Sequence, residues 1–439
     1  MKYPKYPNYK DSGIEWIGEI PEHWNLSKLK YLCSLNADYG VNIKAEDYSD
    51  LGVRFLRTTD IDDEGLLTDE GVRVQETLVS ENILHDGDIL FSRSGSIGRS
   101  FLFDGTLHER SAFAGYLVRF RPNKLNEPKF LFYYSKSRLF GAQIASDSIE
   151  TTIENFNGQK YSNLYVPHPT RNEQSQIVKF LNLETNKINA LISKQQKIIQ
   201  LLKEKRQAII THAVTKGLDP NVHKKDSGIE WIGEIPEHWK VTPLKFVSLV
   251  IMGQSPPSEH YTEAGEIPFL QGCAEFGAVS PDPKHYCEVA TKISQPGDIL
   301  LSVRAPVGEI NLSDKVYGIG RGLCAIRSTS SEQGYIKWWL EAAKRELMTV
   351  STGSTYDAVA VDDVKNLKLS IPCSGDEKKI ILDFLNLEIS KVDSLISKQH
   401  QMIELLKEYK TSLISQAVTG KIDVRGLMQE VNEPAGQAP

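Results

Sequence analysis

Fourteen residues, DSGIEWIGEIPEHW, occur twice in this chain without a single change, first at 11–24 and again at 226–239. A duplication constrains the fold more than any other feature, because each copy then belongs to a structural unit that occurs twice. After each copy, which we call the box, the sequences diverge. Only GDILFSRSGSIG at 87–98 and GDILLSVRAPVG at 297–308 still correspond, and a long helical pattern then follows in both halves. We therefore expect two units, each with a box, a variable domain and a long helix.

The repeat also sets the expected domain boundaries. In chain order these are a box segment at 1–24, a variable domain at 25–170, a long helix at 171–217, a linker with the second box at 218–239, a second variable domain at 240–373, a second long helix at 374–423 and a flexible tail at 424–439. Each variable domain is long enough to bury a core of its own.

The two long helices have the residue spacing of a coiled coil. In the first, the residues at seven-residue intervals are Ile188, Gln195, Leu202 and Ile209, with Leu191 and Ile198 in the second seam position and Ile192 and Ile199 beside them. In the second helix the matching residues are Val392, Gln399, Leu406 and Leu413, with Leu395 and Met402 in the second position. A helix of about 40 residues is roughly 60 Å long, and so long an apolar stripe must be covered. We expect the helices to cover each other as an antiparallel pair, since a pseudo-twofold axis relates the units.

Two features of these helices each allow two interpretations. Gln195 and Gln399 either fix the register of the seam or face solvent at its edge. The first helix, over 172–217, carries eight Lys and Arg residues against three Asp and Glu. That excess is either a local basic footprint for nucleic acid or simply a solvated face.

Composition places the chain among ordinary globular proteins. It is 40% hydrophobic and 25% charged, and no apolar run is long enough to span a bilayer. The opening MKYPKYPNYK lacks the apolar core of a signal peptide, so we expect a cytoplasmic protein. The net charge of −6 argues mildly against a nucleic-acid partner. Charge acts locally, however, and a basic groove can coexist with an acidic remainder.

Motifs for catalysis are missing. The sequence contains no P-loop, and its five cysteines show no metal-ligand or disulfide spacing, which predicts buried thiols and no metal site. GIGRG at 318–322 is interpreted as a structural turn. PDPKHYCEVATK at 281–292 has the wrong spacing for a nuclease motif, and no counterpart in the first unit. His23 and His238, each followed by tryptophan in the box, suit a packed, hydrogen-bonded structural role.

The variable domains are predicted to be mixed α/β. Strands are expected at 53–61, at 267–276 and in both GDIL segments, and helices at 128–146 and 332–348. In GDIL, Gly-Asp makes the turn and Ile-Leu enters a buried strand. The following loops carry small residues and arginine, namely Ser92, Arg93 and Gly95 in one unit and Ser302 and Arg304 in the other. They could approach a phosphate backbone or a guanine edge, or be structural only.

The whole arrangement resembles the specificity subunit of type I restriction-modification systems, over essentially the full chain. The motifs that carry the resemblance are GDIL followed by a small-residue loop, and a helical region that ends in AVTKG at Ala213 and AVTGK at Ala417. GQSPPSEHY at 253–261 and STGSTYDAVAVDDVKNLKLSIP at 351–372 also look like target-recognition segments of that family. The first domain has no Gly-Ser-Thr in the latter place. The resemblance implies an α+β fold of two mixed α/β target-recognition domains, separated by two long helices in an antiparallel coiled coil.

The resemblance also implies function. Such a subunit is not an enzyme: each target-recognition domain reads one half of a bipartite site in double-stranded DNA, the helices set the spacing, and two DNA adenine methyltransferase subunits dock on the repeated parts, with motor-nuclease subunits as a further partner class and no membrane. S-adenosylmethionine, ATP and Mg are expected on those partner subunits and none on this chain. The candidate DNA-binding residues are Arg57, Ser92, Arg93, Ser94, Gly95, Arg99, Gln254, Ser255, Gln271, Ser302, Arg304, Gly353, Ser354 and Thr355.

Two identical boxes can bind two copies of the same partner, whereas two different domains can read two different DNA half-sites. The candidate methyltransferase-binding residues are Trp16, Ile17, Trp24, Trp231, Ile232 and Trp239, because apolar and aromatic anchors dominate interfaces. The alternative is that each box only caps its own domain, with Trp16 and Trp231 in the core. Two rival classes remain: a coiled-coil scaffold that organises proteins without specific DNA binding, and a single-chain restriction enzyme, which would need the missing motifs.

Overall fold

The protein consists of two units. The computed structural model describes residues 3–68, 71–149, 155–329, 332–350 and 358–427. The first unit contains residues 1–195 and 401–439, and the second contains 196–400. Each holds one box, one variable domain and part of both long helices, α5 (Arg171–Lys216) and α9 (Gly375–Val418). The predicted internal repeat and the α+β class are confirmed.

The first unit is built around a four-stranded antiparallel sheet in the order β4-β10-β7-β8. Beside it lies a three-stranded sheet, β6-β5-β9, in which β5 and β9 are parallel. The strands are β4 (Cys33–Tyr39), β5 (Val53–Leu56), β6 (Val72–Val74), β7 (Ile89–Ser92), β8 (Ser100–Leu102), β9 (Ser111–Phe113) and β10 (Leu117–Pro122). The short strands β3 (Asn25–Lys28) and β11 (Tyr165–His168) pair where the variable domain begins and ends.

The second unit repeats this plan, with one further strand in its second sheet. Its four-stranded sheet has the order β15-β22-β19-β20, and the second sheet has the order β17-β16-β21-β18, with β16 and β21 parallel. The strands are β15 (Ser248–Met252), β16 (Pro268–Leu270), β17 (His285–Tyr286), β18 (Ile293–Ser294), β19 (Ile299–Ser302), β20 (Ile310–Leu312), β21 (Tyr317–Ile319) and β22 (Leu323–Ser328), and β14 (Lys240–Pro243) pairs with β23 (Lys368–Ile371). The common topology relates residues of the two units by position.

Several predicted elements are shorter than expected. The strands predicted at 53–61 and 267–276 end at Leu56 and Leu270, and the 3-10 turns η2 (Thr58–Asp60) and η7 (Cys273–Glu275) follow. The helical segment at 128–146 is two helices, α2 (Pro128–Ser135) and α3 (Arg138–Ile149), and that at 332–348 is likewise α6 (Gln333–Ala342) and α7 (Lys344–Val350). The helices α1 (Leu29–Leu32), α4 (Gly158–Asn163) and α8 (Val361–Asn366) complete the domains.

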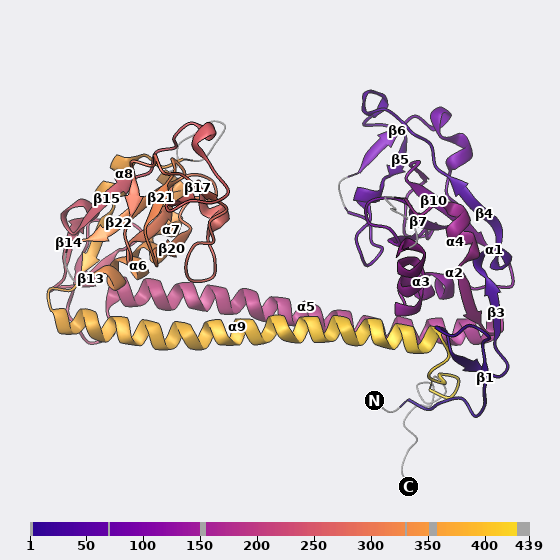
Figure 1. The fold of residues 1–439 in the computed structure, drawn as a ribbon. Helices are drawn as coiled ribbons and strands as arrows, with labels where there is room; N and C mark the ends of the chain where they lie inside the picture. Colours follow the sequence, from indigo (N-terminus) through magenta and orange to yellow (C-terminus); the bar gives the residue numbers. More distant parts are fainter. Residues whose placement is uncertain (1–2, 69–70, 150–154, 330–331, 351–357, 428–439) are drawn as a thin grey trace, which may run out of the picture. The chain divides into compact units, whose positions relative to one another are not determined.

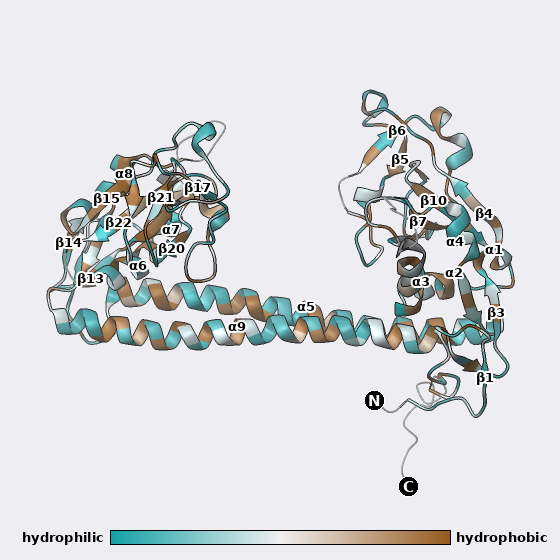
Figure 2. Ribbon diagram, viewed as in Figure 1, coloured by the Kyte–Doolittle hydropathy of each residue, from teal (hydrophilic) through white to brown (hydrophobic). Residues whose placement is uncertain are grey.

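Within each unit, the beginning of one long helix packs against the end of the other. In the first unit Leu181 and Ile188 of α5 share a core with Leu413 and Ala417 of α9. In the second unit Ile210 and Val214 of α5 share a core with Leu385 and Ile389 of α9, among other residues. The predicted antiparallel coiled coil is thereby confirmed. Along both helices, apolar residues alternate with polar ones (Figure 2).

The seam differs from the prediction in its second position. Leu191, Ile198, Leu395 and Met402 are between 40% and 46% exposed. Ile199 and Ile403, one residue further along each helix, are buried. The second seam position is therefore four residues after the first, not three. Leu191, Ile198, Leu395 and Met402 lie on the flank of the seam. Gln195 is half-buried, and its Oε1 atom has no hydrogen-bond partner among the described residues. This burial favours the seam interpretation for Gln195.

A carboxylate, buried in the first unit and half-buried in the second, attaches each box to the first turn of a long helix. Glu173 of α5 accepts hydrogen bonds from Trp24 Nε1 at 3.1 Å and Tyr6 Oη at 2.7 Å, and lies 2.9 Å from His23 Nε2. In the second unit Glu377 of α9 accepts a hydrogen bond from Trp239 Nε1 at 2.9 Å and lies 2.8 Å from His238 Nε2. The hydrogen bonding predicted for both box histidines is confirmed, whereas the prediction that they are packed is wrong, since their side chains are 43% and 47% exposed.

The segments near the two chain ends meet in the first unit. The backbone N–H of Asp423 donates to Pro4 O at 2.8 Å, and the guanidinium of Arg425 lies over the ring of Tyr6. Val424 is fully buried in the core of this unit. The flexible tail predicted at 424–439 is therefore wrong for residues 424–427, because an apolar side chain there completes the core. The remaining residues of that segment lie outside the described part of the chain.

We expect Glu173→Ala to destabilise the first unit by about 2 to 6 kcal/mol, because it leaves two donors, Trp24 Nε1 and Tyr6 Oη, without an acceptor, at about 1–3 kcal/mol each. Chemical denaturation measures the change. The control is Glu404→Ala on α9, an exposed glutamate with a single ion pair to Lys407. Equal stability of the two variants would contradict the structural role of Glu173.

Candidate nucleic-acid interface

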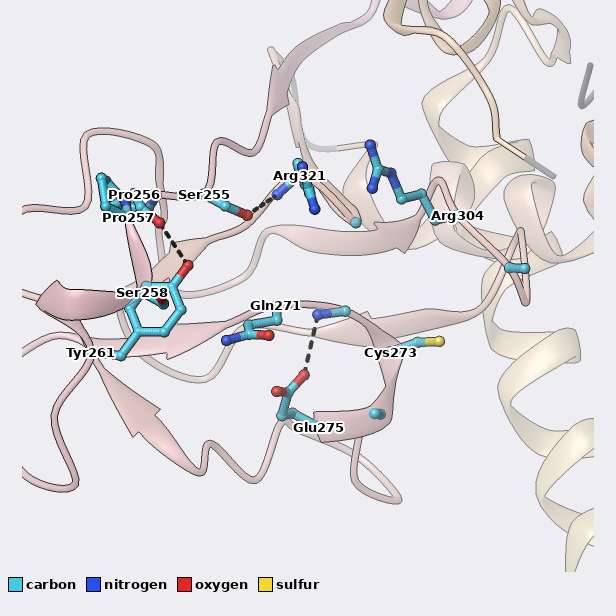
Figure 3. A pocket seen from close by; sticks show the side chains of 14 residues that line it. Ser255, Pro256, Pro257, Ser258, Tyr261, Gln271, Cys273, Glu275, Arg304 and Arg321 are labelled. Atoms are coloured by element: carbon cyan, nitrogen blue, oxygen red, sulfur yellow. Dashed lines mark hydrogen bonds between the residues drawn. The ribbon is translucent and has the colours of Figure 1, made fainter. Parts of the chain in front are cut away.

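In each unit, loops that leave equivalent strands gather at one place. In the second unit, the loops after β15, β16, β19 and β21 line an open pocket of about 820 Å³ (Figure 3). In the first unit, the loops after β4, β5 and β9 line a smaller pocket of about 310 Å³. Tyr261 in the second pocket packs against Phe269, as Tyr48 in the first packs against Phe55. The two pockets are therefore equivalent sites on one scaffold.

Glycines let these loops approach each other closely. A Cβ atom on Gly253 would lie 2.1 Å from the carbonyl oxygen of Gly320, and one on Gly40 would lie 2.3 Å from that of Ala114. Gly322 is similarly close to the backbone of Gln271. The structural interpretation of GIGRG is thus confirmed, because its glycines allow the strand-end packing. The same packing brings Arg321 to the pocket.

The GDIL motif holds the base of each site. Gly87 and Gly297 adopt φ of +83° and +90° in the predicted turns. The aspartates that follow are buried: Asp88 pairs with Arg121 at 2.6 Å, and Asp298 pairs with Arg327 at 2.7 Å. Hydrogen bonding to Asp298 raises the pKa of Arg327. The aspartate of the motif is therefore a structural anchor that fixes the strand before the variable loop.

Three of the predicted residues of the second unit line its pocket, namely Ser255, Gln271 and Arg304. Gln254 is exposed in the same loop as Ser255. Ser302 is buried, and its Oγ donates to Pro306 O and accepts from the backbone N–H of Glu309. The prediction for Ser302 as a DNA contact is therefore corrected: it shapes the loop. Gly353, Ser354 and Thr355 lie outside the described residues.

In the first unit, most of the predicted side chains are used internally. Ser92 is buried, with its Oγ donating to Ser94 O, so it is no surface contact. Arg99 donates to Asp63 Oδ1 at 3.0 Å from Nε, and to the carbonyl oxygen of Ile61 at 2.9 Å. Arg93 is half-buried, over the ring of Tyr39. Ser94 is half-buried and Gly95 exposed in the same loop.

Arg57 lines the pocket of the first unit but is held by a neighbour. Its Nε and Nη2 atoms donate to the buried carboxylate of Asp60 at 3.1 and 2.8 Å. This hydrogen bonding raises the pKa of Arg57. The side chain of Arg57 is 35% exposed to solvent. Arg57 is therefore a positioned cation with part of its surface free.

The boxes separate into buried and exposed parts. Trp24 and Trp239 are fully buried, and Ile17 and Ile232 are also buried. The prediction of these four residues as partner contacts is corrected, because their side chains present no surface in the folded units. Trp16 is 48% exposed. Trp231 is half-buried against Trp339, at a centroid distance of 5.6 Å. The alternative that placed Trp16 in the core is therefore wrong, although Trp24 and Trp239 do cap their domains, and Trp16 remains a candidate contact.

The described residues contain no helix long and apolar enough to cross a membrane. They also contain no group of His, Cys, Asp and Glu that could hold a metal ion. Of the cysteines, Cys33, Cys287 and Cys324 are buried, whereas Cys273 is half-buried at the pocket and Cys373 is exposed. The prediction of buried thiols is therefore wrong for the last two, which lie on loops that follow strands rather than in the core.

Known proteins resemble this chain over nearly its full length. The family model for the type I restriction modification DNA specificity domain matches it twice, at 21–203 and 236–407. A Methanocaldococcus jannaschii protein, named as a candidate MjaX specificity subunit of a type I restriction enzyme, is 31% identical over 97% of this chain and 99% of its own length. The MjaVIII specificity subunit from the same organism is 25% identical over the same shares.

A solved structure from a study of the assembly and conformational transition of the type I R-M system shares the fold. Its TM-score is 0.70 at 23% sequence identity, and the match covers 92% of this chain and 99% of that one. Each family match begins near the end of a box, covers one variable domain and extends into the long helix that follows, and together the two matches span most of the sequence. The protein belongs to the type I restriction-modification DNA specificity family.

Proposed function

We propose that this chain is the non-catalytic specificity subunit of a type I restriction-modification complex, in which each variable domain reads one half of a bipartite DNA site. The main support for the proposal is that the two units share one fold but have different side chains in their equivalent pockets. The second unit has Gln271, Arg304 and Arg321 there, whereas the first has Arg57 and Tyr116. Unlike pockets at equivalent places suit two unlike half-sites.

The rival proposal, a coiled-coil scaffold that binds only proteins, accounts for the helices alone. It does not explain why the two pockets share the closely packed glycine after their first strand, Gly40 and Gly253, while their polar side chains differ. Specific binding of the pure chain to one duplex, competed by that duplex and not by unrelated DNA, separates the two functions. Binding of every sequence with equal affinity would favour the scaffold.

The chemistry is assigned to partner subunits. S-adenosylmethionine is expected on the DNA adenine methyltransferase subunits, and ATP and Mg²⁺ on motor-nuclease subunits where these are present. The chain alone, mixed with DNA and all three, should neither methylate nor cleave. Either activity in a homogeneous preparation would contradict a non-catalytic role.

Exchanging residues 25–170 for another target-recognition domain should change one half of the recognised sequence and leave the other intact. The ends of the exchanged segment are the paired strands β3 and β11, so the graft keeps the boxes and both long helices. Selection of bound sequences from a randomised duplex library measures the outcome. A change in both halves would mean that the domains do not read independently.

We propose that Trp16 is part of the surface on which a methyltransferase subunit docks, since it is the exposed aromatic residue of the first box. Trp16→Ala should weaken that assembly by about 2 kcal/mol or more, measured by titration of the methyltransferase, while the DNA preference stays the same. Leu125→Ala, an exposed apolar residue of the variable domain, is the matched control. Unchanged assembly of the Trp16 variant would place the docking surface elsewhere.

We propose further that the long helices set the distance between the half-sites. Four residues inserted in α5 near Gln195, together with four in α9 near Gln399, add about 6 Å of helix, which is close to two base pairs along the duplex. The doubly lengthened protein should keep both half-sites and prefer a spacer longer by one or two base pairs. An insertion in one helix only is the control and should disturb the seam. Unchanged spacing in a folded double variant would show that the helices do not set the distance.

A further inference from the structure

The pocket of the second unit is lined by two arginines, Arg304 and Arg321. Arg304 and Arg321 are exposed, and neither side chain makes a hydrogen bond or an ion pair with another described residue. Figure 3 shows both side chains extending outward from their loops. Their backbones are fixed. Arg304 forms an isolated antiparallel β-bridge with Ala358, and the backbone N–H of Arg321 donates to Ser255 Oγ at 3.1 Å. The backbones of both arginines are thus held in place, while no side-chain partner stands among the described residues.

The charge of this pocket is unbalanced. Glu275 is the single acidic residue among those that line it, and it is 8% exposed. Its carboxylate accepts a hydrogen bond from the backbone N–H of Gly272 at 3.2 Å and closes the loop after β16. Among the described residues that line the pocket, no exposed carboxylate accompanies these two guanidinium groups. A ligand for this pocket must supply hydrogen-bond acceptors or negative charge.

The other unit shows which arginines belong to the scaffold. Arg121 and Arg327 occupy equivalent strands, and both are paired with the buried aspartate of GDIL. In contrast, the strand pairing places Ser94 at the position of Arg304, and Gly115 at that of Arg321. Sequence-independent contacts to the DNA phosphates would be needed equally by both units. Cations present in one unit only are better suited to a feature that differs between the half-sites.

We propose that Arg304 and Arg321 determine specificity by each donating two hydrogen bonds to O6 and N7 of a guanine in the major groove, so that the half-site read by the second unit contains G·C pairs. The proposal rests on the DNA-binding function proposed above. The planar fork of a guanidinium matches these two acceptors, whereas a lysine ammonium keeps the charge without the fork. Replacement by lysine therefore separates base reading from phosphate attraction.

The test compares the full-length chain with Arg304→Lys and Arg321→Lys, with Arg345→Lys, an exposed arginine outside the pocket, as the control. Each protein selects from a randomised duplex library, and its affinity is measured on the selected site and on duplexes with single G·C pairs replaced. The half that persists after the exchange of residues 25–170 is the half assigned to the second unit.

Each pocket variant should lose about ten- to a hundredfold of its preference for one G·C pair in that half. The other half and the salt dependence of binding should stay the same, because the charge is kept. Lysine variants that keep every base preference, or lose affinity equally on all duplexes, would overturn the proposal while the DNA-binding function stands. A wild-type chain that selects no sequence would overturn both.

Discussion

The fold depends on a glutamate in the first turn of each long helix. Glu173 and Glu377 accept hydrogen bonds from the indole of the tryptophan that ends each box. A buried carboxylate without such donors would be costly, as would a buried indole N–H without an acceptor. Box and helix therefore stabilise each other, and this mutual dependence explains why the box and the start of the helix occur together in both units.

The attachment of each box to a long helix explains the structural role of the duplicated sequence. The buried part of the box, Trp24 and Trp239 with Ile17 and Ile232, is core, so identical residues follow from identical packing against α5 and α9. The exposed remainder, above all Trp16, is free to serve a partner. One short segment can therefore have a structural side and an interaction side, and the two interpretations of the sequence apply to different residues within it.

The periodic and duplicated parts of the sequence predicted the fold well. The GDIL turns, the strands that follow them and both long helices lie where their patterns placed them. The second seam position was shifted by one residue, because Leu191 and Ile192 are equally apolar and only burial distinguishes them. The loops were less predictable. Whether a polar side chain such as Ser302 or Arg99 faces the pocket or serves the loop depends on contacts with residues distant in sequence.

The signals for the residues that were missed were present but ambiguous. Glu173 and Glu377 stand at equivalent places after unlike residues, and only the repeat would have linked them to the box. Arg321 lies within GIGRG. The glycines of this motif predicted a turn, but they did not indicate which side chain the turn places at the pocket. The core residues near the chain ends were missed because Val424 is buried by residues from the other end of the sequence.

Strand-resolved mapping of methylated adenines tests the central claim, that two unlike domains on one scaffold direct modification to a bipartite site. DNA is exposed to this chain together with its methyltransferase subunit, and every modified adenine is located on both strands. The account predicts modification confined to sites with two defined halves, separated by a spacer of fixed length and free sequence. Methylation at a single contiguous motif, or without sequence preference, would contradict it.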